Sequence, residues 1–326
     1  MATDSKTARW KLIVGYTAFA LVAFVLCLLI TFPYDAVRTR IVTEAAGQGL
    51  AVRIGGLRPG LSGVTATDVR VSKPPTPLGA ESVAALARGE SGGLGPAELG
   101  QALTFDTVAV RPALFPPGVV VNAKAMGGTV HVTVGGLSDT SLDVDVDGLQ
   151  AGGGNLPGYT GVDMEGTLNA RISLKAPGTL IRGQAVDWSQ ATGTVALDTQ
   201  GLTIKGGKAA IPMGGGPAMP MDLPRVVLGE LKGDFQFDKG LGTVKDLNLK
   251  SEDLEGLGTG TVKLGKRLEY SELGLDVRLK FEQAFQQRLG PLALAVNMLP
   301  VDRENPGYRG GRLTGMVSSP RFAAKR

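Results

Sequence analysis

The chain of 326 residues is 43% hydrophobic, which is enough to bury a sizeable core and excludes wholesale disorder. Its 34 basic and 30 acidic residues give a formal net charge of +4, and they are scattered singly, which argues against a nucleic-acid partner. One cysteine and one histidine exclude a disulfide framework and a zinc cluster, whereas 48 glycines favour many short strands joined by turns.

The first 40 residues carry the strongest pattern in the sequence. Residues 12–34 hold no charged side chain, and about 20 apolar residues are enough to span the hydrocarbon core of a bilayer. The run exceeds the apolar region of a cleaved signal peptide, and it lacks a small-residue cleavage site. Basic residues precede it at Lys6, Arg9 and Lys11. We expect a cytoplasmic tail over 1–11, a transmembrane helix over 12–34 and the rest of the chain outside the cytoplasm.

The segment after the expected span has helical spacing. Over residues 35–48, Val37, Ile41, Val42 and Ala45 recur at the period of a helix, before two glycines that suit its end. We expect a short amphipathic helix here that lies beside the membrane.

From residue 49 onward, the period of hydrophobicity changes from helical to twofold. Strict alternation is typical of strands with one buried and one solvated face, and glycine-containing turns separate the alternating runs as antiparallel meanders require. The alternating runs lie at residues 50–54, 64–71, 108–110, 130–134, 142–147, 168–174 and 273–281. The sequence therefore predicts a mainly β domain over residues 49–326.

Three stretches interrupt the alternation. A proline- and glycine-rich connection over 73–96 includes a short helix expected at 81–87. Residues 212–224 hold four prolines, which cannot donate to a strand ladder, so we expect a loop or hinge there. Residues 281–299 return to helical spacing with a kink at Gly290-Pro291, and this helix is placed to cap the end of the sheet.

Several motifs suggest chemistry but fit structural roles better. Asp143-Val-Asp-Val-Asp-Gly148 matches the first half of a calcium loop but lacks the glutamate at position 12. We interpret it as a strand with carboxylates on its wet face, the alternative being a weak cation site. His131 has no histidine or cysteine partner, and Glu252 and Asp253 lie in a loop with no partner that the sequence reveals. The glycines of 256–260 precede a strand, whereas phosphate cradles open a helix. We therefore expect no cofactor, no metal site and no enzymatic activity.

Taken together, these features resemble a known family. The short tail, the single span ending in Thr31-Phe-Pro-Tyr34 and the following helix resemble the start of the type II secretion system protein N family. Residues 50–71 are similar to the strand–turn–strand repeat of that family and of AsmA-like bridge proteins, and residues 103–111 and 312–320 resemble further elements.

The resemblance covers the chain end to end. It implies a single-pass protein of the bacterial inner membrane with its N-terminus in the cytoplasm and its β-rich domain in the periplasm. Its partners would be other secretion-system subunits in the inner membrane and periplasm. The families supply no catalytic residue to carry over.

Two functions use the same strands. The first is a structural component of type II secretion, whose sheet edges pair with other subunits by strand addition. The alternative is an AsmA-like lipid-binding or lipid-transfer protein, in which the apolar face of the sheet is a groove for acyl chains. The two differ in whether that face is closed on itself.

The expected helices are too few to cover a sheet of a dozen or so strands, so the sheet must curl. We expect a large curled antiparallel sheet, a half-barrel or trough that is at least partly open, because the resemblance implies one and few large aromatics are present to fill an interior. In that case membrane lipid is both a neighbour and a ligand. The candidate trough face comprises Leu168, Ile172, Leu174, Leu275, Val277 and Leu279.

Overall fold

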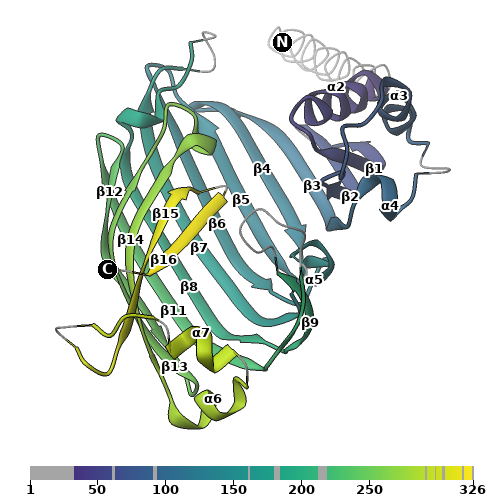
Figure 1. Cartoon of the computed structure of the whole chain (residues 1–326). Coiled ribbons are helices and arrows are strands. Elements are labelled where there is room, and N and C mark those ends of the chain that lie inside the picture. Colours follow the sequence, from purple (N-terminus) through teal and green to yellow (C-terminus); the bar gives the residue numbers. More distant parts are fainter. Residues whose placement is uncertain are drawn as a thin grey trace, which may run out of the picture.

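The main feature of the protein is a single antiparallel sheet of 14 strands that does not close into a barrel, accompanied by few helices (Figure 1). The computed structural model describes residues 33–60, 63–90, 94–160, 162–179, 184–211, 219–290, 292–297, 299–302, 305–317 and 319–324. This architecture confirms the mainly β class that the alternating pattern predicts.

The strands follow one another across the sheet in chain order, apart from β9 and β10, which form a separate pair. In order across the sheet they are β1 (Ala51–Pro59), β2 (Val64–Ser72), β3 (Ala102–Leu114), β4 (Pro117–Ala125), β5 (Gly128–Gly135), β6 (Asp139–Gln150), β7 (Met164–Pro177), β8 (Thr192–Ile204), β11 (Val226–Asp238), β12 (Leu241–Lys250), β13 (Leu254–Lys263), β14 (Glu272–Phe281), β15 (Arg309–Met316) and β16 (Ser319–Ala324).

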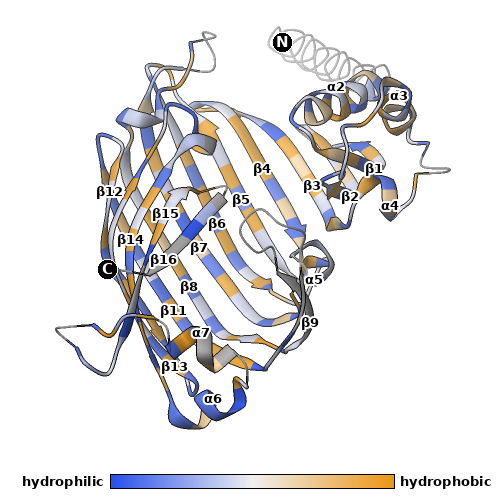
Figure 2. Cartoon of the chain, in the orientation of Figure 1, coloured by the Kyte–Doolittle hydropathy of each residue, from blue (hydrophilic) through white to orange (hydrophobic). Residues whose placement is uncertain are grey.

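The alternating runs noted in the sequence fall in these strands, and their two faces differ in burial. On β7, Leu174 and Ala176 are buried, whereas Arg171, Ser173 and Lys175 are exposed. Figure 2 shows the same alternation as hydrophobic and hydrophilic bands along the strands. A twofold period puts successive side chains on opposite faces, so the sheet has one apolar and one polar face.

The sheet curls, and its apolar face lines the inside of the curl. The helices α6 (Gln283–Arg288) and α7 (Leu292–Asn297) lie within the curve at the lower end in Figure 1, and they pack on apolar side chains of the strands. The expected kink at Gly290-Pro291 matches the break between the two helices, where Gly290 has a positive φ of 54°. These helices cap one end of the sheet, as the spacing over 281–299 predicts.

Glycines on the apolar face make room for the curl. When a sheet bends, side chains on the inner face converge, and a glycine opposite a large side chain relieves the crowding. Leu247 of β12 lies between Gly233 of β11 and Gly258 of β13, and a Cβ on Gly258 would overlap the Leu247 side chain. A Cβ on Gly242 would likewise overlap the ring of Phe237. The glycine-rich run 256–260 therefore forms part of a strand.

The N-terminal part of the described chain packs three helices against the first strands. These are α2 (Tyr34–Gly47), α3 (Ala80–Arg88) and α4 (Pro96–Leu99), and the first two match the helices expected at 35–48 and 81–87. Val42 of α2 is fully buried with Leu86 of α3 and Leu99 of α4. Val42 is the single buried residue of α2 and Ile41 is 40% exposed, so the amphipathic character expected for this helix is weak.

Among the described residues, no helix is both long enough and apolar enough to cross a bilayer. The expected cytoplasmic tail and residues 12–32 of the expected span lie outside the described part of the chain.

The expectation of a loop over 212–224 needs a correction. Residues 219–223 form β10 (Met219–Leu223), which pairs with β9 (Gly207–Ile211) as a separate two-stranded ribbon. Each strand of such a ribbon has one unpaired edge, which tolerates proline, and Pro220 lies in β10 opposite Ala210. Residues 212–218 lie outside the described part.

Asp253 has partners that the sequence does not reveal. This carboxylate is buried at the lower end of the sheet, where it accepts a hydrogen bond of 2.7 Å from the backbone N–H of Val227 and pairs with Arg288 of α6. Val227 and Arg288 lie 26 and 35 positions from Asp253 in the sequence, so no local motif predicts these contacts. The pair fixes α6 to the sheet.

Substituting a glycine of the apolar face tests whether these glycines make room for the large side chains that converge when the sheet curls. We expect Gly258→Ala to lower the free energy of unfolding by about 1–3 kcal/mol, because its methyl group overpacks against Leu247. The same change made in a Leu247→Ala background should cost much less, which denaturant titration of the four variants measures as a coupling energy.

Gly274→Ala is the matched control. It also lies in a strand, but its added methyl group would be no closer than 3.7 Å to any neighbour, so we expect a change within about 0.5 kcal/mol. Equal costs at Gly258 and Gly274 would contradict the role of Leu247.

Candidate functional site

The residues of the candidate trough face lie on the apolar face. On β7, Ile172 lies opposite Val195 of β8, which lies opposite Phe235 of β11. On β14, Leu275 lies opposite Leu313 of β15. The structure brings Ile172, Leu174, Leu275 and Val277 into one cluster that spans both halves of the sheet.

At one end, the part of the apolar face formed by β7, β11, β13 and β14 is packed shut. Leu174 and Leu275 are only 5% and 7% exposed, and they share a cluster with buried Phe237 of β11. The β7–β8 connection covers this cluster with Val186 and Trp188, the latter at the start of the short helix η2 (Trp188–Gln190). The remaining buried members are Ala176, Ala191, Val262 and Leu264.

Backbone hydrogen bonds hold this cover in place. The N–H of Trp188 donates to the carbonyl of Lys266, which precedes the short helix η3 (Leu268–Tyr270), at 3.3 Å. Gly240, in the β11–β12 turn, donates to Ala191 and accepts from Leu264, each at 2.8 Å. Three connections between strands are thus joined across one end of the sheet.

The other end of the apolar face is covered by α6. Leu279 packs in a cluster with buried Leu254, Phe285 and Leu289. The rings of Phe281 and Phe285 are stacked with their centroids 6.2 Å apart, which fixes α6 on the end of β14. Of the six candidate residues, Leu279 is therefore the one that faces a helix.

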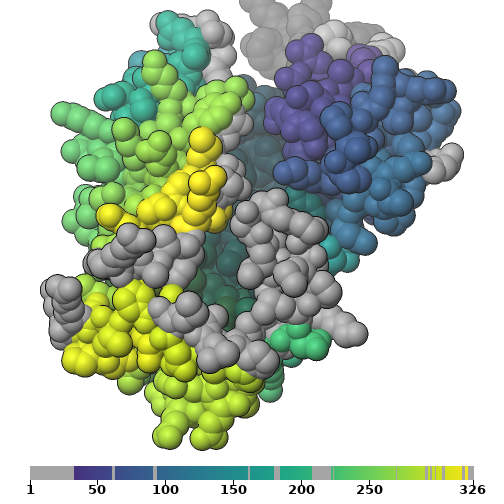
Figure 3. Space-filling model, in the orientation of Figure 1, coloured from purple at the N-terminus to yellow at the C-terminus, as the bar shows by residue number. Residues whose placement is uncertain are grey.

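Between these ends the apolar face is only half covered. Ile172 and Val277 are half-buried at the edge of the first cluster, and Leu168 is half-buried and lies outside both described clusters. In Figure 3 the surface is hollowed near its centre, and strands in the middle of the sheet are visible at the bottom of the hollow. The expected trough face is thus a packed core at its ends and a partly open surface in its middle.

The polar face carries the residues that resembled a metal site. Asp145 pairs with Arg171 at 3.5 Å, and the Asp143 carboxylate accepts a hydrogen bond of 2.7 Å from Ser173. The two carboxylates lie on the exposed side of β6, which confirms the strand interpretation. Nδ1 of the His131 ring lies 2.5 Å from Oδ1 of Asn122. These residues engage side chains of neighbouring strands.

A shallow hollow of about 830 Å³ lies over this polar face between β5 and β11. Polar side chains of both signs line it, including Asp145, Arg171 and Lys232. Within the described residues, no group of three or more His, Cys, Asp or Glu side chains is placed to hold a metal ion.

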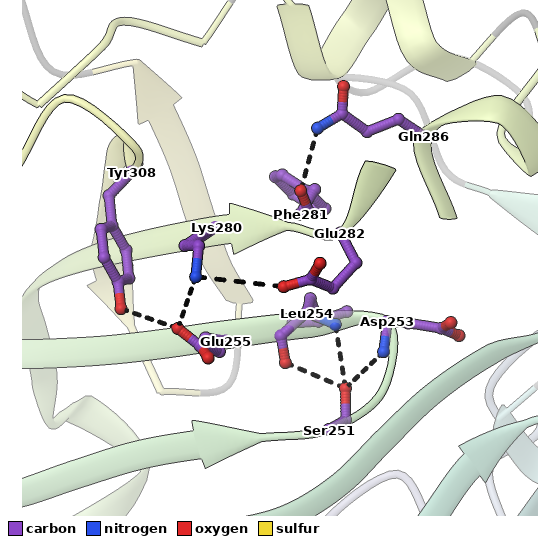
Figure 4. A network of polar contacts seen from close by, with 9 residues as sticks. All are labelled: Ser251, Asp253, Leu254, Glu255, Lys280, Phe281, Glu282, Gln286 and Tyr308. Carbon is purple, nitrogen blue, oxygen red and sulfur yellow. Dashed lines mark hydrogen bonds and ion pairs between the residues drawn. The ribbon is translucent and has the colours of Figure 1, made fainter. Parts of the chain in front are cut away.

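A second polar network lies where β13 and β14 meet the segment before β15 (Figure 4). Lys280 Nζ and the Tyr308 hydroxyl both donate to Glu255 Oε2, at 3.2 and 3.1 Å. The hydrogen bond from Lys280 lowers the pKa of Glu255, and the same bond raises the pKa of Lys280. Burial, followed by the hydrogen bond to Glu255, raises the pKa of Tyr308. At neutral pH the three groups therefore keep the protonation states that bind them together.

The sequence analysis missed the residues that close the packed end. Trp188 lies in a connection between strands, where no periodic pattern assigns it a face. Phe237 lies near the end of a strand that the sequence analysis did not identify. A tryptophan flanked by polar residues in a loop is a weak sign of a core position, and only the return of the loop over the sheet reveals it.

No family model, no curated protein and no solved structure matches this chain.

Because the apolar face is buried at its end and half exposed in its middle, truncating a leucine should lower the free energy of unfolding by different amounts at the two places. We expect Leu174→Ala to lower the free energy of unfolding by about 2–5 kcal/mol, because a buried leucine leaves a cavity. Leu168→Ala, which removes the same atoms from the same strand at a half-exposed position, should cost about 1–2 kcal/mol. Denaturant titration of the two variants and the parent compares them. Similar costs would show that the two positions are equally packed.

Proposed function

We propose that the protein is a single-pass inner-membrane component of the type II secretion system, with a structural role in protein export and no catalytic activity. Its β-rich domain would stand in the periplasm, tethered by the uncharged run over residues 12–34. The resemblance of its sequence motifs to the protein N family of that system supports this assignment.

The packing of the apolar face is the observation that carries the proposal. A protein that passes acyl chains along such a face needs an apolar path that is open at its ends. Here the cluster around Leu174 and Leu275 fills one end of the face over β7, β11, β13 and β14, and α6 covers the other end through Phe285. Filled ends favour a scaffold over a conduit.

The lateral edges of the sheet supply a means of assembly. β16 pairs with β15 on one side only, and β1 pairs with β2 on one side only. An edge strand presents a row of main-chain donors and acceptors to which a strand of another chain can add. Because α2 and α3 contact β1, β16 is the edge that we assign to a secretion-system subunit.

A second candidate function rests on the half-exposed middle of the same face. The sheet is open and curled, as an AsmA-like trough would be, and in Figure 3 the surface is hollowed over strands in the middle of the sheet. In this reading, lipid acyl chains lie against the middle of the face, and the protein binds or transfers lipid.

Crosslinking combined with a secretion assay tests the first function. We expect loss of the gene in the native bacterium to reduce the set of secreted proteins in the culture medium, and the full chain to restore it. A photo-crosslinking residue in place of Arg321, on β16, should capture another secretion subunit. The same residue in place of Lys245, on an interior strand, is the matched control, because both side chains are exposed. Unchanged secretion, or identical crosslinks at both positions, would contradict the proposal.

Lipid analysis separates the two functions. For a scaffold, Ile172→Asp should lower the melting temperature of the full chain strongly, since its charge disturbs a packed cluster, and the parent protein should carry no specific lipid. For a trough, the melting temperature should shift little while mass spectrometry shows that a lipid bound by the parent is lost. Val277→Asp, on the facing strand β14, should behave in the same way in each case.

A further inference from the structure

Large apolar side chains are exposed at the turns of one end of the sheet. Leu114 and Phe115 lie at the β3–β4 turn and are 77% and 95% exposed, and Leu137 at the β5–β6 turn is 63% exposed. Turns between strands are usually polar, and a group of exposed large apolar side chains marks an interaction site. We call these three residues the apolar rim.

The apolar rim is one surface held by its backbone. Gly136 N–H, in the β5–β6 turn, donates to the carbonyl of Pro117 at the start of β4 at 3.0 Å. Thr179, in the next connection along the sheet, donates through its hydroxyl to the carbonyl of Gly136 at 3.0 Å. Two turns and a connection are thus linked side by side, so the exposed side chains project from a common edge.

The surroundings of the apolar rim match the layers of a bilayer surface. An apolar groove of about 550 Å³ lies directly behind it, lined in part by Val119, Val134 and Thr140 of the apolar face. Arg111 lies three residues before Leu114 on β3 and is exposed, and Arg58 is exposed near the end of β1. Apolar side chains that project from a turn preceded by an exposed arginine fit acyl chains below anionic headgroups.

The position of the anchor points to the same surface. The uncharged run over residues 12–34 leads directly into α2, which begins at Tyr34. In Figure 1, α2 lies at the upper end of the molecule, and the β3–β4 and β5–β6 turns form the upper edge of the sheet. α2 and the apolar rim thus lie on the same, upper side of the molecule in this view, while Val42 of α2 packs with Ala51 at the start of β1 and with Leu99 shortly before β3.

We propose that the apolar rim is a second membrane contact, which inserts into the surface of the bilayer that the anchor enters. This inference rests on the membrane tether of the proposed function. The rim and the anchor together hold the sheet upright on the membrane, with the end that carries α5 (Leu156–Thr160) pointing away. The groove behind the rim then opens at the level of the lipid chains.

Tryptophan quenching in vesicles tests this orientation. The full chain is reconstituted into phosphatidylethanolamine–phosphatidylglycerol vesicles with or without phosphatidylcholine brominated in its acyl chains. Subtracting the parent spectrum removes the emission of Trp10 and Trp188. We expect the added indole of Phe115→Trp to emit at shorter wavelength and to lose most of its intensity in brominated vesicles. Leu137→Trp, at the neighbouring turn, provides an independent probe with the same expected result.

Tyr159→Trp is the matched control at the opposite end. It is also an exposed aromatic position, at 42%, and its helix adjoins the start of β3 through the hydrogen bond from Asn155 to Ala102. The 13 residues of β3, each rising about 3.3 Å, separate it from the rim by roughly 40 Å. Its emission should not respond to bromine.

Flotation of the same vesicles on a density gradient distinguishes the possible failures. If the chain floats but the Phe115→Trp and Leu137→Trp variants are quenched no more than the Tyr159→Trp variant, the rim contact is wrong and the tether stands. If the chain does not float, both the tether and the rim contact are wrong. Concentration-dependent quenching of the Phe115→Trp variant by a second copy without lipid would assign the rim to self-association and overturn the inference.

Discussion

The structure depends on one constraint, which is that a single layer of strands with one apolar face has to keep that face from water with very few helices. A second sheet or a layer of helices would normally cover it. Here the described helices gather at the ends, so the sheet shelters its own apolar face by bending around it. The bending in turn requires small residues where side chains converge, and glycines such as Gly258 meet that requirement.

Bending leaves the two ends of the curl to be closed by other means, and the chain closes them differently. At one end the connections between strands return over the apolar face and join through backbone hydrogen bonds, with Trp188 and Leu264 packed beneath them. At the other end α6 lies on the face and is fixed by the buried carboxylate of Asp253. The middle has no such cover, so any exchange with an apolar partner has to occur there or at the apolar rim.

The way in which the ends of the apolar face are covered bears on both the proposed scaffold function and the lipid-binding alternative. A packed end resists deformation, which suits a subunit that presents the edge strand β16 to a partner. The half-exposed stretch around Leu168 and the groove near Val119 provide apolar surface that either function could use. The two proposed functions therefore differ only in the middle of the apolar face, which would hold lipid in a trough and would not in a scaffold. The rest of the fold is compatible with both.

The sequence alone determined the elements and faces of those segments in which a local period is clear, whereas other strands, such as β11, were not identified from it. Alternation from Leu168 to Leu174 and from Leu273 to Phe281 placed the strands and identified which side of each is apolar, and the glycine at position 290 marked the break between α6 and α7. Only the tertiary structure decided how deeply each position is buried. Leu168 and Leu174 have the same residue type and the same face, yet only Leu174 is enclosed, because Trp188 returns over that end. Asp253 finds Arg288, and β10 pairs with β9, through contacts that no local pattern encodes. The period of the sequence shows on which face of the sheet a side chain lies. Whether that side chain is buried depends on segments distant in the sequence, and the curl of the whole sheet determines where those segments lie.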